Sequence, residues 1–430
     1  MIASRRSLSQ AAFASRVDIF TSAAITDGAI SFAALLRGLP GVYPTEVLAS
    51  VDRLAGDKTI DAAVAASIRR EAAITSTTAA EGRSLLPLPH PLDYEWRFTP
   101  DAARSLLNRA ADLTRAEDDL LLFGTPGLAV EALTLPIGRR LAFLAESNKI
   151  TDRVLALNRA TGSPLSIAFC SGGLPRESAD AVLLDPPWYL DFVRPMLSAA
   201  AHACRPGGVV LISLAPTGAR PSAEADRHII IGFARRLGLA LIDHSPLAIG
   251  YETPFFERNA LAAAEIYPPP QWRRGDLVVF RKTCASTRPP PLSSVGRREW
   301  SEVAIGRMRL FIRRADETNS DEASLTSLVD GDILPTVSRR DPRRLLAKVW
   351  TSGNRIFHTD NPQLVLEAAI SCTGEAMGSG VQPRLWGTIR ERETLERIAT
   401  ELRALAAIEA QEEGNGPTGT TERSVAWRWS

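Results

Sequence analysis

The sequence predicts an α/β protein whose centre is a doubly wound, mostly parallel sheet. Between about residues 90 and 283, short apolar segments of strand length alternate with segments that have helical apolar spacing. A second indication is Asp185-Pro186-Pro187-Trp188, which directly follows the apolar run at residues 181–184. A polar and aromatic turn after a short buried strand is typical of the carboxyl edge of a sheet, where open α/β folds place their ligands.

The predicted strands follow one another along the middle of the chain. They cover residues 119–123, 140–144, 166–170, 181–184, 208–214, 239–243 or the following 247–250, and 277–281. The helical segments between them include residues 128–135, 190–204 and 223–237. This alternation predicts a seven-stranded sheet that occupies residues 89–283 and closes with a hairpin-like pair.

The N-terminal part predicts a small helical domain over residues 18–88. Apolar residues have helical spacing at residues 30–39, Pro40-Gly41 interrupts them, and a second amphipathic helix spans residues 43–54. Residues 56–60 then predict the turn and strand of a wing, so the domain is expected to be winged-helix-like. The second helix carries few basic residues, which favours packing against a protein partner or a second copy of the chain over base reading.

The C-terminal part predicts a linker followed by another folded region. Pro289-Pro290-Pro291 lies in a linker at residues 284–299, and the tail at 413–430 is polar and expected to be flexible. An α+β region is predicted between them at residues 300–412, with a half-exposed strand in the second half of residues 302–313 and an amphipathic helix at residues 391–411. Its basic cluster at residues 339–344 would suit phosphate contacts if the substrate is DNA or RNA.

The composition bounds the remaining classes of function. The chain has 430 residues, is 45% hydrophobic and has a formal net charge of +1, so nothing in the overall charge demands a polyanionic partner. Its Cys and His residues show no metal-ligand spacing, and no apolar run reaches the roughly 18 residues that a membrane span needs. We therefore expect a cytoplasmic protein with reduced thiols, no metal site and no membrane segment.

The Asp185-Pro186-Pro187-Trp188 segment suits the binding of a planar amine. The two prolines lack N–H donors and force the chain out of the sheet, which leaves their carbonyls available to a pocket. The Asp185 carboxylate can accept N–H groups from the amine, while Trp188 or Tyr189 offers a flat face for stacking. A proline-rich turn with a buried tryptophan is the alternative interpretation.

Three further segments predict a cofactor site near this turn. The strand at residues 119–123 runs into Gly124, Thr125, Pro126 and Gly127, where glycines allow close backbone approach and a helix begins. Glu146 ends the next strand and has the position of a ribose-binding acid. Phe98-Thr99-Pro100 lies upstream, where Thr99 either caps a helix or contacts the cofactor.

Taken in this order, these motifs resemble the class I S-adenosylmethionine-dependent methyltransferases of the N6-adenine type. The resemblance covers about residues 90–283 and implies the Rossmann-like seven-stranded sheet of that class. It implies that S-adenosyl-L-methionine is the cofactor and that Asp185, Pro186, Pro187 and Trp188 hold the target amine. Cofactor contacts would come from a larger set of residues: Phe98, Thr99, Gly124, Thr125, Pro126, Gly127, Glu146 and Ser171.

The resemblance also implies residues that contact the acceptor. Tyr189, Tyr251 and Phe255 are the candidates, the latter two in a segment where related enzymes present an aromatic side chain to a flipped base. The acceptor would be adenine N6 in nucleic acid, although the residues themselves leave DNA, RNA, protein and small amines open.

A second resemblance extends over more of the chain. A winged helix followed by this sheet and a DPP-aromatic motif is similar to the branched-chain polyamine synthases, which are aminopropyl transferases. Those enzymes have an acidic Gly-Asp-Asp-Asp turn where this chain has Gly124-Thr125-Pro126-Gly127. Aminopropyl transfer to a polyamine is therefore one alternative, and a non-catalytic scaffold on the same fold is another.

Overall fold

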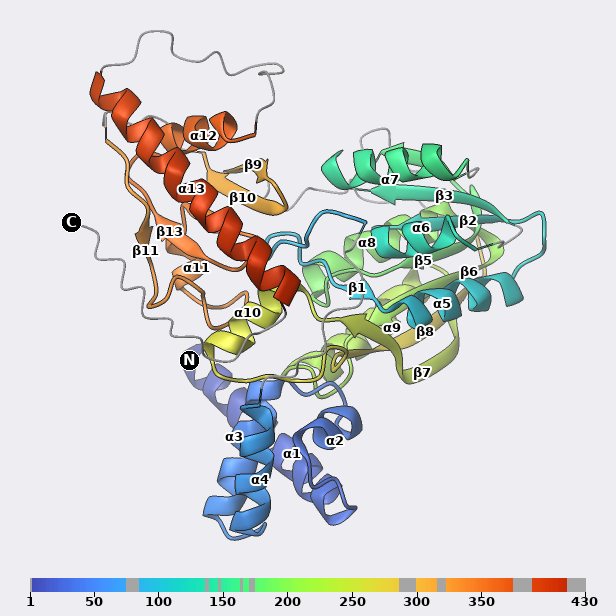
Figure 1. Cartoon of the computed structure of the whole chain (residues 1–430). Helices are drawn as coiled ribbons and strands as arrows, with labels where there is room; N and C mark the ends of the chain where they lie inside the picture. The colour runs from blue at the N-terminus through green and yellow to red at the C-terminus, as the bar shows by residue number, and fades with distance from the viewer. Residues whose placement is uncertain are drawn as a thin grey trace. The chain divides into compact units, whose positions relative to one another are not determined.

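The computed structural model describes residues 2–74, 85–135, 139–145, 148–162, 165–169, 175–285, 299–314, 322–373 and 389–415. The chain forms two compact units (Figure 1). Unit 1 comprises Met1–Glu71, Trp96–Thr253 and Pro268–Ser293, whereas unit 2 comprises Ala72–Glu95, Pro254–Tyr267 and Ser294–Ser430. Each unit is therefore assembled from segments that are far apart in the sequence. The described residues include no helix that is long and apolar enough to cross a membrane.

The N-terminal segment is helical, with α1 (Ile2–Thr26), α2 (Phe32–Gly38), α3 (Pro44–Gly56) and α4 (Ala62–Ala72). The structure confirms the two helices predicted near residues 30–39 and 43–54. Ser31 starts α2 by accepting a hydrogen bond from the Ala34 amide, and Pro44 occupies the first turn of α3.

The predicted wing strand at residues 56–60 is wrong. The Leu54 carbonyl accepts hydrogen bonds from the amides of Thr59 and Ile60 at 2.8 and 3.3 Å, which makes this segment the C-terminal turn of α3. Lys58 has a left-handed backbone with φ of 58°, and α4 follows directly. A glycine-containing polar turn can end a helix or join two strands. Here the hydrogen bonds to the Leu54 carbonyl of α3 make it the end of a helix.

The larger sheet has eight strands among the described residues, in the order β1-β7-β8-β6-β5-β2-β3-β4. Strands β2 to β6 run parallel, while β8 is antiparallel to both of its neighbours, β6 and β7. The bounds are β1 (Arg97–Phe98), β2 (Asp119–Phe123), β3 (Arg140–Ala145), β4 (Ser166–Phe169), β5 (Ala179–Leu184), β6 (Cys204–Leu214), β7 (Leu239–Glu252) and β8 (Arg274–Lys282).

This order confirms the predicted fold class. Seven of these strands have the order of the class I methyltransferase sheet, in which the antiparallel β8 lies between β6 and β7. The short strand β1 is added at the edge, next to β7. The two segments predicted as alternatives near residues 239–250 belong to one long strand, β7. Its register shifts between Ser245 and Ile249, as expected for a strand that contains Pro246.

Helices connect the strands and lie against the sheet (Figure 1). They are α5 (Pro100–Asp112), α6 (Pro126–Ala132), α7 (Asn148–Thr161), α8 (Leu190–Ala203) and α9 (Ala223–Arg236). Val182 and Leu184 of β5 belong to the core with α8 and α9. Leu183 between them lines a cavity with Leu106 of α5, because successive strand residues point to opposite faces.

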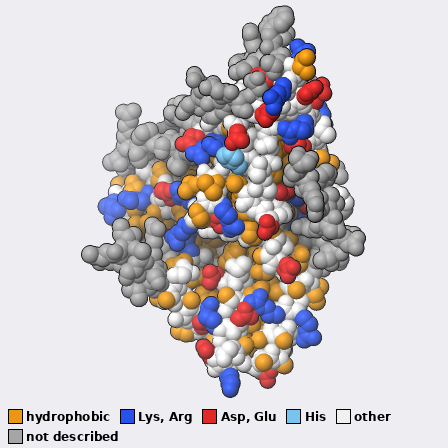
Figure 2. Space-filling model, turned by 90° about the vertical axis from the view of Figure 1, so that its left-hand side faces the viewer, with side chains coloured by type: hydrophobic (Ala, Val, Ile, Leu, Met, Phe, Trp, Pro, Cys, Tyr) orange, Lys and Arg blue, Asp and Glu red, His pale blue; other side chains and the backbone are white. Residues whose placement is uncertain are grey.

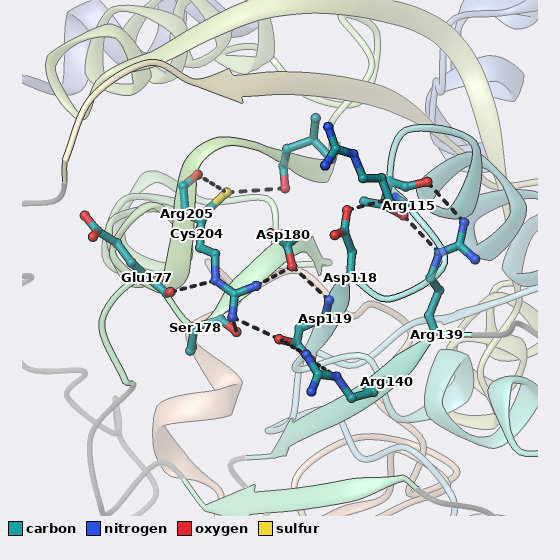
Figure 3. A network of polar contacts seen from close by, with 12 residues as sticks. Arg115, Asp118, Asp119, Arg139, Arg140, Glu177, Ser178, Asp180, Cys204 and Arg205 are labelled. Carbon is teal, nitrogen blue, oxygen red and sulfur yellow. Dashed lines mark hydrogen bonds and ion pairs between the residues drawn. The ribbon is translucent and has the colours of Figure 1, made fainter.

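An ionic network joins the amino ends of three parallel strands (Figure 3). Arg205 near the start of β6 pairs with Asp119 at 2.9 Å and also with Asp180, and the Asp119 amide donates to the Asp180 carboxylate at 2.9 Å. Because these residues lie at the starts of their strands, the network holds the edge of the sheet opposite to the carboxyl edge of the parallel strands.

Unit 2 contains an antiparallel sheet in the order β11-β13-β12-β10-β9. Its strands are β9 (Trp300–Ile305), β10 (Met308–Arg313), β11 (Thr326–Ser327), β12 (Val349–Thr351) and β13 (Ile356–His358). Its helices are α10 (Phe255–Ala263), α11 (Arg343–Leu346), α12 (Pro362–Ser371) and α13 (Ile389–Asn415). The strand predicted in the second half of residues 302–313 is present as β10, and the helix predicted at residues 391–411 is present as α13. Strand β10 is buried rather than half exposed, because Arg309 pairs inside the unit with Asp93 and Glu302.

Candidate active site

The two principal predicted motifs meet at the carboxyl edge of the parallel strands. Phe123 of β2 lies opposite Leu184 of β5 in the parallel register. Gly124 and Asp185 are the residues that follow, so the glycine turn and the Asp185-Pro186-Pro187-Trp188 segment leave the sheet side by side. This placement is the one expected for the ligand site of an open α/β sheet.

The Asp185 carboxylate is hydrogen-bonded to a buried tyrosine. The Tyr251 hydroxyl donates to the Asp185 carboxylate at 2.7 Å and is also hydrogen-bonded to the Ser213 hydroxyl at the end of β6. Tyr251 is only 1% exposed. Burial, reinforced by the charge of Asp185, raises the pKa of Tyr251 well above its usual value, so the phenol remains a protonated donor.

The Tyr251 ring is enclosed by other aromatic side chains. Phe98 of β1 lies opposite it in the antiparallel register, with ring centroids 5.2 Å apart. The rings of Trp188 and Trp96 lie 5.6 and 6.3 Å away, both edge-on. The structure therefore brings together three predicted residues, Phe98, Trp188 and Tyr251. The Tyr251 ring packs against aromatic neighbours and is buried, so it does not offer a free face for stacking.

Gly275 makes this close packing possible. A Cβ atom at this position would lie 2.8 Å from the Ser213 hydroxyl oxygen and 3.0 Å from ring atoms of both Trp188 and Tyr251. Only glycine leaves room for the three side chains to meet here.

The predicted cofactor turn has the backbone that glycine favours. Gly124 has a φ of +65°, and Pro126 starts α6. Thr125 is 4% exposed, and its hydroxyl has no hydrogen-bond partner among the described residues. It lines a cavity of about 10 Å³ together with Phe98 and Ser213. A buried hydroxyl without a partner is costly, which is consistent with a group that bonds it when bound.

Other predicted cofactor residues have structural roles or lie outside the described residues. Thr99 caps α5, because its hydroxyl accepts a hydrogen bond from the Ala102 amide at 3.2 Å. Gly127 approaches the Arg97 side chain. Glu146 and Ser171 lie outside the described residues, so their cofactor contacts stay predictions.

The remaining acceptor candidates lie in different places. Tyr189 precedes α8, and the Arg220 guanidinium lies 5.0 Å from its ring centroid. Phe255 is buried in α10 of unit 2. The Pro187 carbonyl accepts the Tyr189 amide at 2.7 Å, whereas no donor among the described residues bonds the Pro186 carbonyl.

Two residues that sequence reasoning missed complete the site. Trp96 directly precedes β1 and Arg273 directly precedes β8, and β7 pairs with both of these strands. The Arg273 guanidinium lies 3.9 Å from the ring centroid of Trp96 and 4.4 Å from that of Trp188. A signal was present in the basic and aromatic run Trp272-Arg273-Arg274, but only the strand order shows which face it reaches.

The basic cluster at residues 339–344 is partly used within unit 2. Arg343 pairs with Asp341 at 2.7 Å, and Arg344 donates to the Val337 carbonyl at 2.9 Å while stacking on Trp350. On the face drawn in Figure 2, basic and acidic side chains are interspersed. Neither observation provides a continuous phosphate-binding surface. Among the residues with described positions, no group of three His, Cys, Asp or Glu side chains could hold a metal ion.

The strand order of the larger sheet defines a class I methyltransferase-like fold. No protein-family model matches the chain, and no curated protein matches its sequence. Solved structures that resemble it include the branched-chain polyamine synthase of Thermus thermophilus, in complex with N4-aminopropylspermidine and 5'-methylthioadenosine. That structure is 14% identical with a TM-score of 0.47, and the match covers 65% of this chain and 90% of that chain.

Two methyltransferase structures show the same kind of likeness. A putative RNA methyltransferase from Pyrococcus horikoshii is 18% identical with a TM-score of 0.35, covering 50% of this chain and 100% of that chain. Geranyl diphosphate C-methyltransferase from Streptomyces coelicolor A3(2) is 12% identical with a TM-score of 0.32, covering 43% and 79%. These scores are low, so the fold assignment rests on the strand order itself.

Proposed function

We propose that the protein is an S-adenosylmethionine-dependent methyltransferase that acts on an amine nitrogen. The observation that carries this proposal is the position of Asp185. This residue follows β5 beside the Gly124 turn, and its carboxylate accepts a hydrogen bond from the Tyr251 hydroxyl. A carboxylate beside a proline carbonyl accepts N–H hydrogen bonds, which suits an amine better than a hydroxyl or a carbon acceptor.

The residues at the turn are consistent with a bound cofactor. Gly124 and Thr125 would contact it, and the buried Thr125 hydroxyl is an observation in favour, because it lacks a partner among the described side chains. When bound, S-adenosyl-L-methionine supplies an electrophilic methyl group. The chain itself would orient the amine through Asp185 and the Pro186 carbonyl and exclude water with the aromatic side chains around Tyr251.

Adenine N6 in nucleic acid is the acceptor that we propose, because the Asp185-Pro186-Pro187-Trp188 motif resembles that of adenine methyltransferases. One face of Trp188 already carries the Arg273 guanidinium. A stacked base would therefore use the other face or lie against the guanidinium itself.

The test combines cofactor binding with transfer of a labelled methyl group. Calorimetry should detect S-adenosyl-L-methionine binding to the full chain, and mass spectrometry after incubation with DNA, RNA and amine metabolites should identify the methylated product. Asp185→Asn should lower transfer by about a hundredfold while cofactor binding persists, because the amine then meets one neutral acceptor oxygen in place of two charged ones.

Asp191→Asn is the matched control, since Asp191 is exposed in the first turn of α8 and should leave transfer unchanged. Failure of the folded chain to bind S-adenosyl-L-methionine would refute the cofactor assignment. Unchanged transfer in Asp185→Asn would remove this residue from the mechanism.

A further inference from the structure

Arg273 has an unusual environment at the edge of the candidate site. Its guanidinium lies between two indole rings, 3.9 Å from the centroid of Trp96 and 4.4 Å from that of Trp188. Its side chain is half-buried. Among the described residues, no carboxylate lies within ion-pair distance of this guanidinium and no acceptor is hydrogen-bonded to it.

Other arginines of unit 1 show what a half-buried cation normally requires. Arg220 stacks on Tyr189 in a similar way, yet it also pairs with Asp226 at 2.7 Å. Arg227 pairs with Asp276. Arg273 alone among these three lacks a carboxylate, although partial burial makes an uncompensated charge costly.

The stacking determines where a partner could bind Arg273. A guanidinium carries its five N–H donors in one plane, and two flanking rings leave only that plane open. A phosphate or a carboxylate matches this fork with two parallel hydrogen bonds. The cation–π contacts hold the fork in place, so an oxyanion would meet a preorganised partner.

The position links this partner to the amine site. The Tyr251 amide donates to the Arg273 carbonyl at 3.1 Å, so the Arg273 backbone is attached to the residue whose hydroxyl holds Asp185. Trp188 belongs to the motif that contains Asp185 and also forms one wall of the guanidinium site.

We propose that Arg273, clamped by Trp96 and Trp188, is an oxyanion-binding residue of the acceptor pocket, and that the methyl acceptor therefore carries a phosphate or carboxylate group near its amine. This inference deepens the proposed function and rests on it, because the ligand of Arg273 is a methyl acceptor only if the protein transfers methyl groups. The oxyanion site itself requires no methyl transfer.

The test measures binding of inorganic phosphate and of acetate to the full chain at constant ionic strength. Ligand-observed NMR, through the phosphorus signal of phosphate and the carbon signal of labelled acetate, distinguishes the two sources. The wild-type chain should bind at least one of these anions, and Arg273→Gln should weaken that binding about tenfold or more, because charge-assisted hydrogen bonds are lost. A preference for phosphate would indicate a phosphoester acceptor, and a preference for acetate would indicate a carboxylate.

Arg274→Gln is the matched control, because the neighbouring side chain is exposed and its loss removes the same charge. It should retain binding within about twofold, since exposed charges are screened by salt. Arg273→Lys keeps the charge but loses the fork, so it should bind more weakly than wild type, and it tests the same point if the glutamine variant does not fold.

Absence of binding of both anions, or equal binding by wild type and Arg273→Gln, would overturn the proposal. Calorimetry with S-adenosyl-L-methionine on the same proteins separates the two hypotheses. Anion binding without cofactor binding would refute the methyltransferase assignment and leave the oxyanion site intact.

Discussion

Tyr251 shows how one side chain combines a packing role with a polar role. Its ring fills the space between Phe98 and Trp188, while its hydroxyl connects Ser213 to Asp185. Substitution by phenylalanine separates the two roles, because the ring remains and only the hydroxyl is removed.

We expect Tyr251→Phe to lower the free energy of unfolding by about 1–3 kcal/mol, because buried polar partners lose a hydrogen bond. Methyl transfer should fall about tenfold or more, since the Asp185 carboxylate loses the hydrogen bond from the Tyr251 hydroxyl, while cofactor binding should persist. Urea unfolding and single-turnover transfer measure the two effects. Tyr267→Phe, a half-buried tyrosine of unit 2, serves as the control. Full activity in Tyr251→Phe would show that Asp185 needs no support from this hydroxyl.

At the scale of elements, packing of α1 on α3 depends on a polar contact. Asp18 of α1 accepts hydrogen bonds from the Ser50 hydroxyl at 2.6 Å and from Arg53 at 2.8 Å, both on α3. Partial burial acts to raise the pKa of Asp18, but the hydrogen bonds from Arg53 and Ser50 outweigh it, so the pKa lies below its ordinary 3.8.

This shift predicts a pH dependence of stability. A lowered pKa in the folded state stabilises the fold above the ordinary pKa of about 3.8, and the stabilisation is lost as the pH falls through the lower folded value. Asp18→Asn should therefore be less stable than wild type by about 0.5–1 kcal/mol at pH 7, as for a partly exposed pair. The difference should shrink as the pH falls below about 3.8.

Urea unfolding at a series of pH values measures this difference. Asp52→Asn disrupts the more exposed pair between Asp52 and Arg69 and should have a smaller effect at pH 7. A stability difference that stays constant down to pH 3 would contradict the assigned role of the Asp18 carboxylate.

At the scale of the whole molecule, unit 2 depends on segments that are separated in the sequence. Arg309 of β10 pairs with Asp93 and donates to the Leu88 carbonyl at 2.9 Å, and Asn259 of α10 donates to the Gly353 carbonyl at 3.0 Å. The segments at residues 85–95 and 254–267 therefore find their polar partners in the C-terminal part of the chain.

A chain that ends at residue 293 should accordingly be destabilised by at least about 3 kcal/mol, because Asp93 loses its buried partner Arg309. Thermal unfolding followed by circular dichroism should show a lower Tm, and binding of a hydrophobic dye should increase as Phe255 and other apolar side chains of α10 lose their cover. Addition of a separate chain of residues 294–430 should restore the transition. An unchanged Tm after truncation would mean that these segments are stable without their partners.

Much of the sheet could be predicted because burial appears in the local pattern. Residues 120–123 form a continuous apolar run, and β2 comprises this run and the preceding Asp119. Asp185 could be placed at the strand end for the same reason, and Phe98 and Tyr251 were recognised from motifs. The prediction of a wing at residues 56–60 failed because the composition of this segment fits both a helix-ending turn and a hairpin. Only the hydrogen bonds to the Leu54 carbonyl of α3 distinguish the two structures.

The sequence by itself determined most strands and helices of the larger sheet and the turn for which we propose amine binding, because periodicity and proline act over a few residues. The tertiary structure alone decided that Tyr251 supports Asp185 and that Arg273 lies between Trp96 and Trp188. These residues are separated by up to about 180 positions and meet because β7 pairs with β1 on one side and β8 on the other. Strand order is a property of the whole sheet, so no local pattern contains it.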